Sequence, residues 1–90
     1  MRRKVALVYY NFLDRKGGKR VVGGVETYLW NLSKLIADRG DEPILIQPGE
    51  IAFDHQIDHL RVIGMPSAKG KIRSKIRKDL YQYALSIVEE

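Results

Sequence analysis

The stretch Gly23–Gly40, GGVETYLWNLSKLIADRG, decides the fold that we expect for this chain. Its glycine pair opens an amphipathic run, and Gly40 is typical of the residue that follows a helix end. The apolar residues of this run recur at the spacing of one helix face: Val25, Leu29, Leu32 and Ile36. Trp30 falls opposite that face, where it would either pack under a neighbouring element or dock a partner.

Apolar segments on both sides of this helix predict strands. The run Lys4–Tyr10 is typical of a strand covered on both faces. Glu42–Gln47 predicts a second strand that ends at the turn signal Pro48-Gly49, and the alternation over Ile57–Ile63 predicts a third. A final helix that runs to the C-terminus is indicated by an apolar stripe: Ile72, Ile76, Leu80, Tyr83 and Ile87.

This βαββα order predicts an α/β fold, the Rossmann-like first half of a doubly wound, mostly parallel sheet. In such a sheet a further strand would lie beside the first one. We therefore expect the chain to be a fragment whose first strand is an unprotected edge, able to support self-association.

Composition narrows the class of protein. A chain of 90 residues that is 44% apolar and 30% charged fits one small globular domain. It has no cysteine, which excludes disulfides and thiolate metal sites. The apolar part of the N-terminal MRRKVALVYY is too short for a signal peptide, and no run approaches the length of a membrane span. We expect a cytoplasmic protein.

The formal net charge of +5 is concentrated in three segments: Arg2–Lys4, Arg15–Arg20 and Lys69–Lys78. Two explanations of these clusters are open. The basic residues simply lie on solvated loops and a charged helix face, or they bind an anionic partner such as a phosphate, an acidic lipid surface or nucleic acid. We do not expect nucleic acid, because the chain has no recognition-helix, zinc or stacking-strand signature. A non-catalytic basic module that binds anions remains the alternative function.

The order of strand, glycine loop and helix is half of a phosphate-binding βαβ unit, since open amides and the helix dipole attract anions. Gly17–Arg20 is not a P-loop, because no Ser or Thr follows its lysine. The second strand ends at Gln47 without the acid that binds ribose in dinucleotide sites, so we expect no nicotinamide cofactor.

Several segments together resemble the N-terminal start of the retaining GT-B glycosyltransferases of the group 1, family 4-like type. They are GGVET, ADRGDEP with the following ILIQPG, and Arg61–Pro66, RVIGMP. Asp41 and Pro43 depart from the usual R-G-H-E-V pattern of that family. In these enzymes two Rossmann-like domains face each other across a cleft.

The resemblance implies that residues 1–90 form part of the acceptor-side domain and that the nucleotide-sugar domain is absent. No catalytic residue is then present, and this chain alone is inactive. Gly23, Gly24, Val25 and Glu26 would approach the donor's diphosphate or sugar, although Glu26 fits a helix-capping role equally well. The nucleotide sugar is a substrate, and neither a cofactor nor a metal is expected.

The acceptor implied by the resemblance is a glycan or a lipid-linked, cell-envelope precursor. Lys69, Lys71, Arg73 and Arg77 are the candidates for contact with it or with an anionic membrane surface. Tyr81, Leu85 and Val88 lie opposite the core stripe of the same helix, and would either rest on lipid or pack against a further part of the domain. The first alternative places the protein peripherally at the inner face of the membrane.

Two histidines and two aspartates are close in sequence: Asp54, His55, Asp58 and His59. They would converge on a metal ion if this stretch were helical. Because we expect loop and strand here, we interpret them as surface residues.

Overall fold

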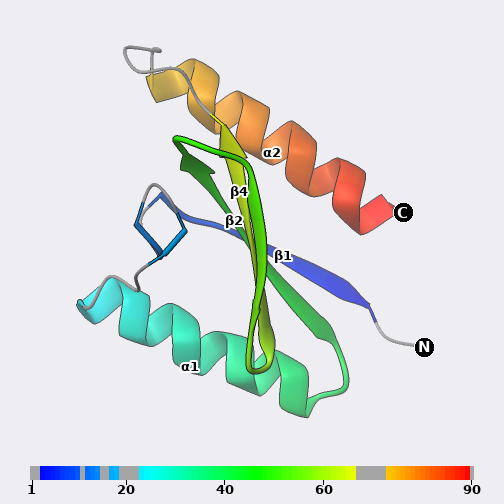
Figure 1. The fold of residues 1–90 in the computed structure, drawn as a ribbon. Helices are drawn as coiled ribbons and strands as arrows, with labels where there is room; N and C mark the ends of the chain where they lie inside the picture. The colour runs from blue at the N-terminus through cyan, green and yellow to red at the C-terminus, as the bar shows by residue number, and fades with distance from the viewer. Residues whose placement is uncertain (1–2, 11, 15–16, 19–22, 67–72, 90) are drawn as a thin grey trace.

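The computed structural model of the chain describes residues 3–10, 12–14, 17–18, 23–66 and 73–89, with the side chains of 73–77 and 89 outside that description. Its elements are β1 (Lys4–Val8), α1 (Gly24–Asp38), β2 (Glu42–Gly49), β3 (Phe53–Ile57), β4 (Leu60–Pro66) and α2 (Arg73–Glu89). Figure 1 shows the sheet between the two helices, one on each face.

The strands form one mixed, mostly parallel sheet in the order β1-β2-β4-β3. β2 pairs in parallel with β1 and with β4, while β3 is antiparallel to β4. The helices α1 and α2 follow β1 and β4 and cover opposite faces (Figure 1). The expected α/β fold with a mostly parallel sheet is confirmed.

The single strand predicted over Ile57–Ile63 is wrong. The structure has a hairpin there, in which β3 ends at Ile57 and β4 begins at Leu60. The turn residue Asp58 has φ +51°, a left-handed conformation that Asp adopts more readily than most residues. β2 also runs through Pro48 to Gly49 instead of ending at Gln47. The order is therefore βαβββα.

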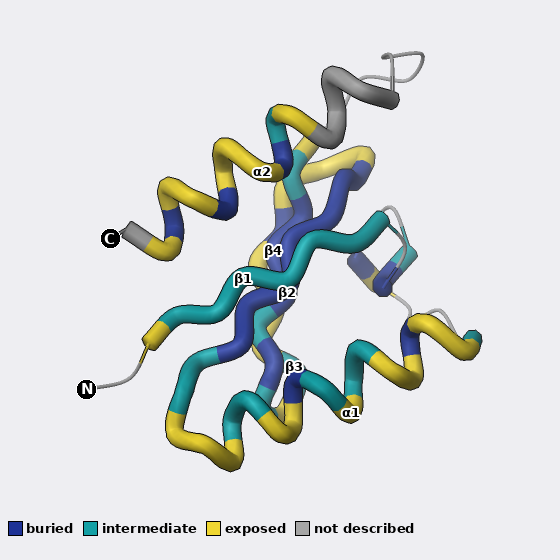
Figure 2. The backbone as a smooth tube through the Cα atoms, turned by 180° about the vertical axis from the view of Figure 1, so that it is seen from behind, coloured by how far each residue is buried: buried dark blue, intermediate teal, exposed yellow. Residues whose placement is uncertain are grey.

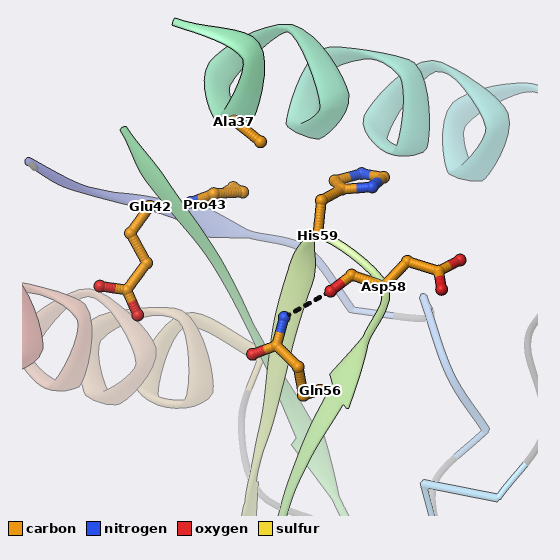
Figure 3. A pocket seen from close by; sticks show the side chains of 6 residues that line it. All are labelled: Ala37, Glu42, Pro43, Gln56, Asp58 and His59. Carbon is orange, nitrogen blue, oxygen red and sulfur yellow. Dashed lines mark hydrogen bonds between the residues drawn. The ribbon is translucent and has the colours of Figure 1, made fainter. Parts of the chain in front are cut away.

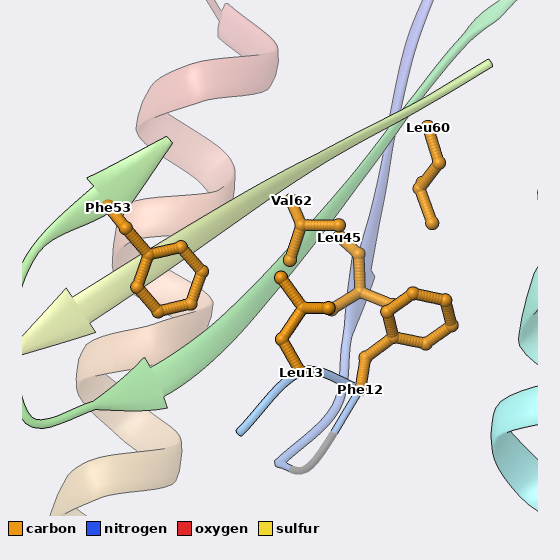
Figure 4. Packing of buried hydrophobic residues seen from close by; sticks show 6 residues of the cluster. All are labelled: Phe12, Leu13, Leu45, Phe53, Leu60 and Val62. Carbon is orange, nitrogen blue, oxygen red and sulfur yellow. The ribbon is translucent and has the colours of Figure 1, made fainter. Parts of the chain in front are cut away.

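Each face of the sheet has its own apolar core. On the α1 side the cluster comprises Phe12, Leu13, Leu45, Phe53, Leu60 and Val62 (Figure 4). On the α2 side it comprises Ile44, Ile46, Ile63, Leu80, Ala84 and Ile87. β2 contributes to both and is buried along most of its length (Figure 2), as expected for a central strand with a helix on either face.

The predicted core faces of both helices need correction. In α1, Val25 is exposed, whereas Trp30 packs against the cluster and Ser33 is buried. In α2, Ala84 takes the core position that we predicted for Tyr83, which is 38% exposed. α1 ends where predicted, and Gly40 follows it at φ +88°.

The Phe53 ring lies between two glycines. A Cβ added at Gly17 would come within 2.6 Å of the ring, and one added at Gly64 would also overlap it. Gly17 has φ +74° as well, which itself favours glycine. These two glycines let the ring lie against the backbone of the β1–α1 connection and of β4.

We expect Gly64→Ala to destabilise the fold by about 1–3 kcal/mol, because the added methyl group overpacks the site occupied by Phe53. Urea unfolding followed by the fluorescence of Trp30, the one tryptophan, measures this. Gly24→Ala is the matched control, since a Cβ there meets nothing within 4 Å. An equal cost of Gly64→Ala in a Phe53→Leu background would contradict the explanation.

Candidate functional site

The candidate site lies where the parallel strands end and α1 begins. β1, β2 and β4 are mutually parallel through β2, so their carboxyl ends share one edge of the sheet. The connection that follows β1 leads to the first turn of α1 at that edge (Figure 1). In open α/β sheets, ligands bind in the crevice outside the carboxyl ends of the strands.

Glu26 closes the inner side of this first turn. It is in the first turn of α1 and is only 8% exposed. A Cβ at Gly23 would lie 2.8 Å from Glu26 Oε2, so glycine at this position makes room for the carboxylate. A negative charge at this end of a helix is favoured by the helix dipole. The structure thus gives Glu26 a buried position that its sequence context did not predict.

Tyr9, just beyond β1, is the partner of this carboxylate. Its phenol donates a hydrogen bond to Glu26 Oε1 at 3.3 Å. Partial burial, together with the charge and the hydrogen bond of Glu26, raises the pKa of Tyr9 above its usual value. Tyr9 therefore stays a neutral donor at physiological pH, next to an acceptor with further lone pairs.

The outer side of the same turn is open. Gly24 and Val25 are both exposed. Gly23, at the N-cap, has an extended backbone (φ −173°, ψ −179°) and makes no side-chain cap. The first N–H groups of a helix have no partner within it, so these amides are available to an anion. Packing against the described residues does not account for glycine at position 24, because a Cβ there has free space.

Gln47 fixes the connection beside the site. This fully buried side chain accepts a hydrogen bond from the Leu13 amide at 2.7 Å and donates one to the Leu13 carbonyl at 2.9 Å. These two hydrogen bonds have the same donor and acceptor arrangement as those between the backbones of two adjacent strands. Sequence analysis missed this role, and the available signal was a lone amide side chain at the end of an apolar strand.

A further pocket of 310 Å³ lies at the opposite end of the sheet (Figure 3). It is lined by Ala37, Glu42, Pro43, Gln56, Asp58 and His59. Behind it, His59 Nε2 lies 2.7 Å from Ser33 Oγ, which donates to the Trp30 carbonyl at 2.7 Å. The Ser33 hydroxyl is thus held between the Trp30 carbonyl and the His59 ring. This contact, with Ser33 fully buried, is structural and does not form a nucleophile–base pair.

The residues considered for a metal site are held apart in the structure. His55 stacks on Phe53, and His59 lies against Trp30. Asp54 receives two hydrogen bonds from Arg61, at 2.9 and 2.7 Å, which lower the pKa of Asp54. The described residues contain no group of three His, Cys, Asp or Glu side chains that could hold a metal ion.

The basic candidates for an anionic surface lie largely outside the described residues. Lys69 and Lys71 belong to the segment that is not described, and Arg73 and Arg77 are described only as backbone in α2. Of the two described helices, neither combines the length and the apolar character needed to span a membrane.

Comparison with protein-family models, with curated proteins and with solved structures finds no match for this chain.

We expect Gln47→Ala to cost at least about 2 kcal/mol, because it leaves the buried amide and carbonyl of Leu13 without partners. Urea unfolding gives the free energy, and amide hydrogen exchange at Leu13 gives the local effect. Gln56→Ala is the control, since that side chain is exposed and bonds only to the Asp58 carbonyl among its described contacts. Equal losses in both variants would contradict the role of Gln47.

We expect Glu26→Gln to lower the pKa of Tyr9 toward 10.0, because the nearby negative charge is removed. A raised folded-state pKa stabilises the protein below pH 10, and this contribution disappears as pH rises through the folded-state value. The ¹³Cζ resonance of Tyr9 reports the titration. Glu50→Gln, an exposed site after β2, is the control. An unchanged Tyr9 pKa in Glu26→Gln would disprove the coupling.

Proposed function

We propose that this chain is the first part of the acceptor-side domain of a GT-B glycosyltransferase and that it meets a nucleotide-sugar donor at the first turn of α1. The observation that carries this proposal is the open, glycine-bearing turn at the carboxyl edge of the sheet. Gly24 has no packing reason among the described residues to be glycine, and a bound phosphate would supply one.

The two sides of the turn suit two parts of such a donor. The exposed amides of Gly24 and Val25 fit the diphosphate, whose growing negative charge they would stabilise as it leaves. Glu26 and Tyr9 fit the sugar, since a carboxylate accepts hydrogen bonds from hydroxyl groups and a phenol both donates and accepts. The negative charge of Glu26 on the inner side of the turn would repel a second negative charge there. A ligand that keeps its own negative charge on the outer side, near the amides, is therefore favoured.

The acceptor would be an anionic glycan or lipid-linked precursor. Its candidate contacts are the basic residues Lys69, Lys71, Arg73 and Arg77, which the net charge of +5 supports. Transfer itself would require a nucleotide-sugar domain in the complete enzyme. The donor is a substrate in this proposal, which requires neither a metal nor an organic cofactor.

Titration with uridine, guanosine and adenosine diphosphates and with inorganic pyrophosphate, followed by NMR, tests the proposal. We expect the amide resonances of Gly23–Glu26 to shift with at least one nucleotide. Gly24→Val should weaken this binding at least about tenfold, because the side chain would cover the amides. Asn31→Val, which places the same side chain at an exposed site further along α1, should leave it unchanged.

The alternative function, a basic module that binds nucleic acid, predicts the opposite result in these titrations. If short duplex DNA bound with a steep salt dependence while the diphosphates left the first-turn amides unshifted, the chain would be a basic nucleic-acid module. The glycosyltransferase proposal would then be wrong.

A further inference from the structure

β1 has a paired neighbour on one side only within the described residues. The Arg3 carbonyl accepts from Glu42 at 2.7 Å, and the Tyr9 amide donates to Ile46 at 3.1 Å, both toward β2. Backbone groups alternate in direction along a strand, so those of Lys4, Ala6 and Val8 face away from β2. This edge therefore offers a row of donors and acceptors to a further strand.

An apolar groove of 360 Å³ runs beside this edge, between β1 and α2. Its lining residues are Ala6, Val8, Tyr81, Ala84, Leu85 and Val88. On α2, Tyr81 is 54% exposed, Leu85 61% and Val88 42%. Figure 2 shows the exposed outer side of α2 above the half-buried β1. An open strand edge with an apolar helix face fits an occupant that brings both a strand and apolar side chains.

We propose that this occupant is a second copy of the chain, paired through β1 about a two-fold axis at Ala6. The outward residues are evenly spaced about Ala6, so an antiparallel pair places Lys4 opposite Val8 of the partner subunit and Ala6 opposite its own copy. Each opposed pair can then exchange both backbone hydrogen bonds. The interface is isologous. It uses the edge of β1 at which a complete doubly wound sheet would place its next strand, so the dimer and such a strand exclude each other.

The helices fit this symmetry. α2 contacts both β1 and β2 and so lies over that pair of strands. In the two-fold dimer the two copies of α2 are therefore separated by about two strand spacings, or roughly 9.6 Å. This separation matches the 8–10 Å at which helices pack. Tyr81 and Leu85 would then fill the groove of the opposite copy.

The two edges of the sheet differ in the side chains that they expose. The opposite sheet edge is less suitable, because β3 exposes the polar side chains of Asp54, His55 and Gln56.

Sedimentation velocity across a concentration range tests the proposal with the full chain. We expect a species of twice the 10.4 kDa chain mass. Leu85→Glu should weaken dimerisation at least about tenfold by placing a charge in the interface. Leu35→Glu is the matched control, because Leu35 is 62% exposed on α1, on the other face of the sheet, and should still dimerise. A monomeric parent chain, or equal dimerisation of both variants, would overturn the proposal.

A cysteine probe tests the register, since the chain has no cysteine of its own. Ala6→Cys should form an intermolecular disulfide at least about tenfold faster than Leu35→Cys, because opposed residues of paired strands lie within disulfide range. Equal rates would overturn the two-fold pairing. A monomer that binds anionic phosphatidylserine vesicles through Leu85 would assign the groove to lipid and would also overturn it.

Discussion

The paired hydrogen bonds between Gln47 and Leu13 hold residues 12–14, after β1, against the end of β2, and much of the α1-side core depends on them. Because Gln47 is fully buried, its amide and the Leu13 backbone have no alternative partner in water and must satisfy each other. With Leu13 held there, Phe12 reaches the Trp30 ring of α1, and Gly17 lies against Phe53. The side-chain amide of Gln47 thus forms with Leu13 the pair of hydrogen bonds that the backbone of a neighbouring strand would otherwise form.

Elements with a regular apolar period were predictable from the sequence, whereas the hairpin was not. The apolar run of β1, the glycines around α1 and the stripe of α2 are local signals, and their elements form as expected. The β3–β4 turn contains Asp58 and His59 but no glycine, proline or asparagine. In the hairpin Ile57 pairs with Leu60 and both lie at the α1-side cluster, whereas one continuous strand would place them on opposite faces. Without a turn signal in the sequence, this change of face could not be predicted.

Only the backbone of the candidate site, the start of α1, could be predicted from the sequence, and its side-chain contacts could not. The glycine pair marks the start of α1 from sequence alone, because that relation is local. The burial of Glu26 depends on Tyr9, which lies 17 residues earlier and reaches it only once β1 and α1 are packed together. Trp30 likewise enters the core through Phe12 and His59, contacts that its helical position cannot reveal. Long-range polar contacts of this kind leave no periodic trace in the sequence.

β1 connects the candidate site with the proposed interface, and burial explains why one strand can serve both. β2 is almost fully buried, whereas every residue of β1 is only half-buried. Strands at the edge of a sheet are less stabilised than its buried centre, so a new neighbour at β1 would stabilise that strand. Tyr9 follows directly from this strand and reaches Glu26 at 3.3 Å. A second copy on the Ala6 edge would therefore also hold in place the backbone that positions the Tyr9 phenol.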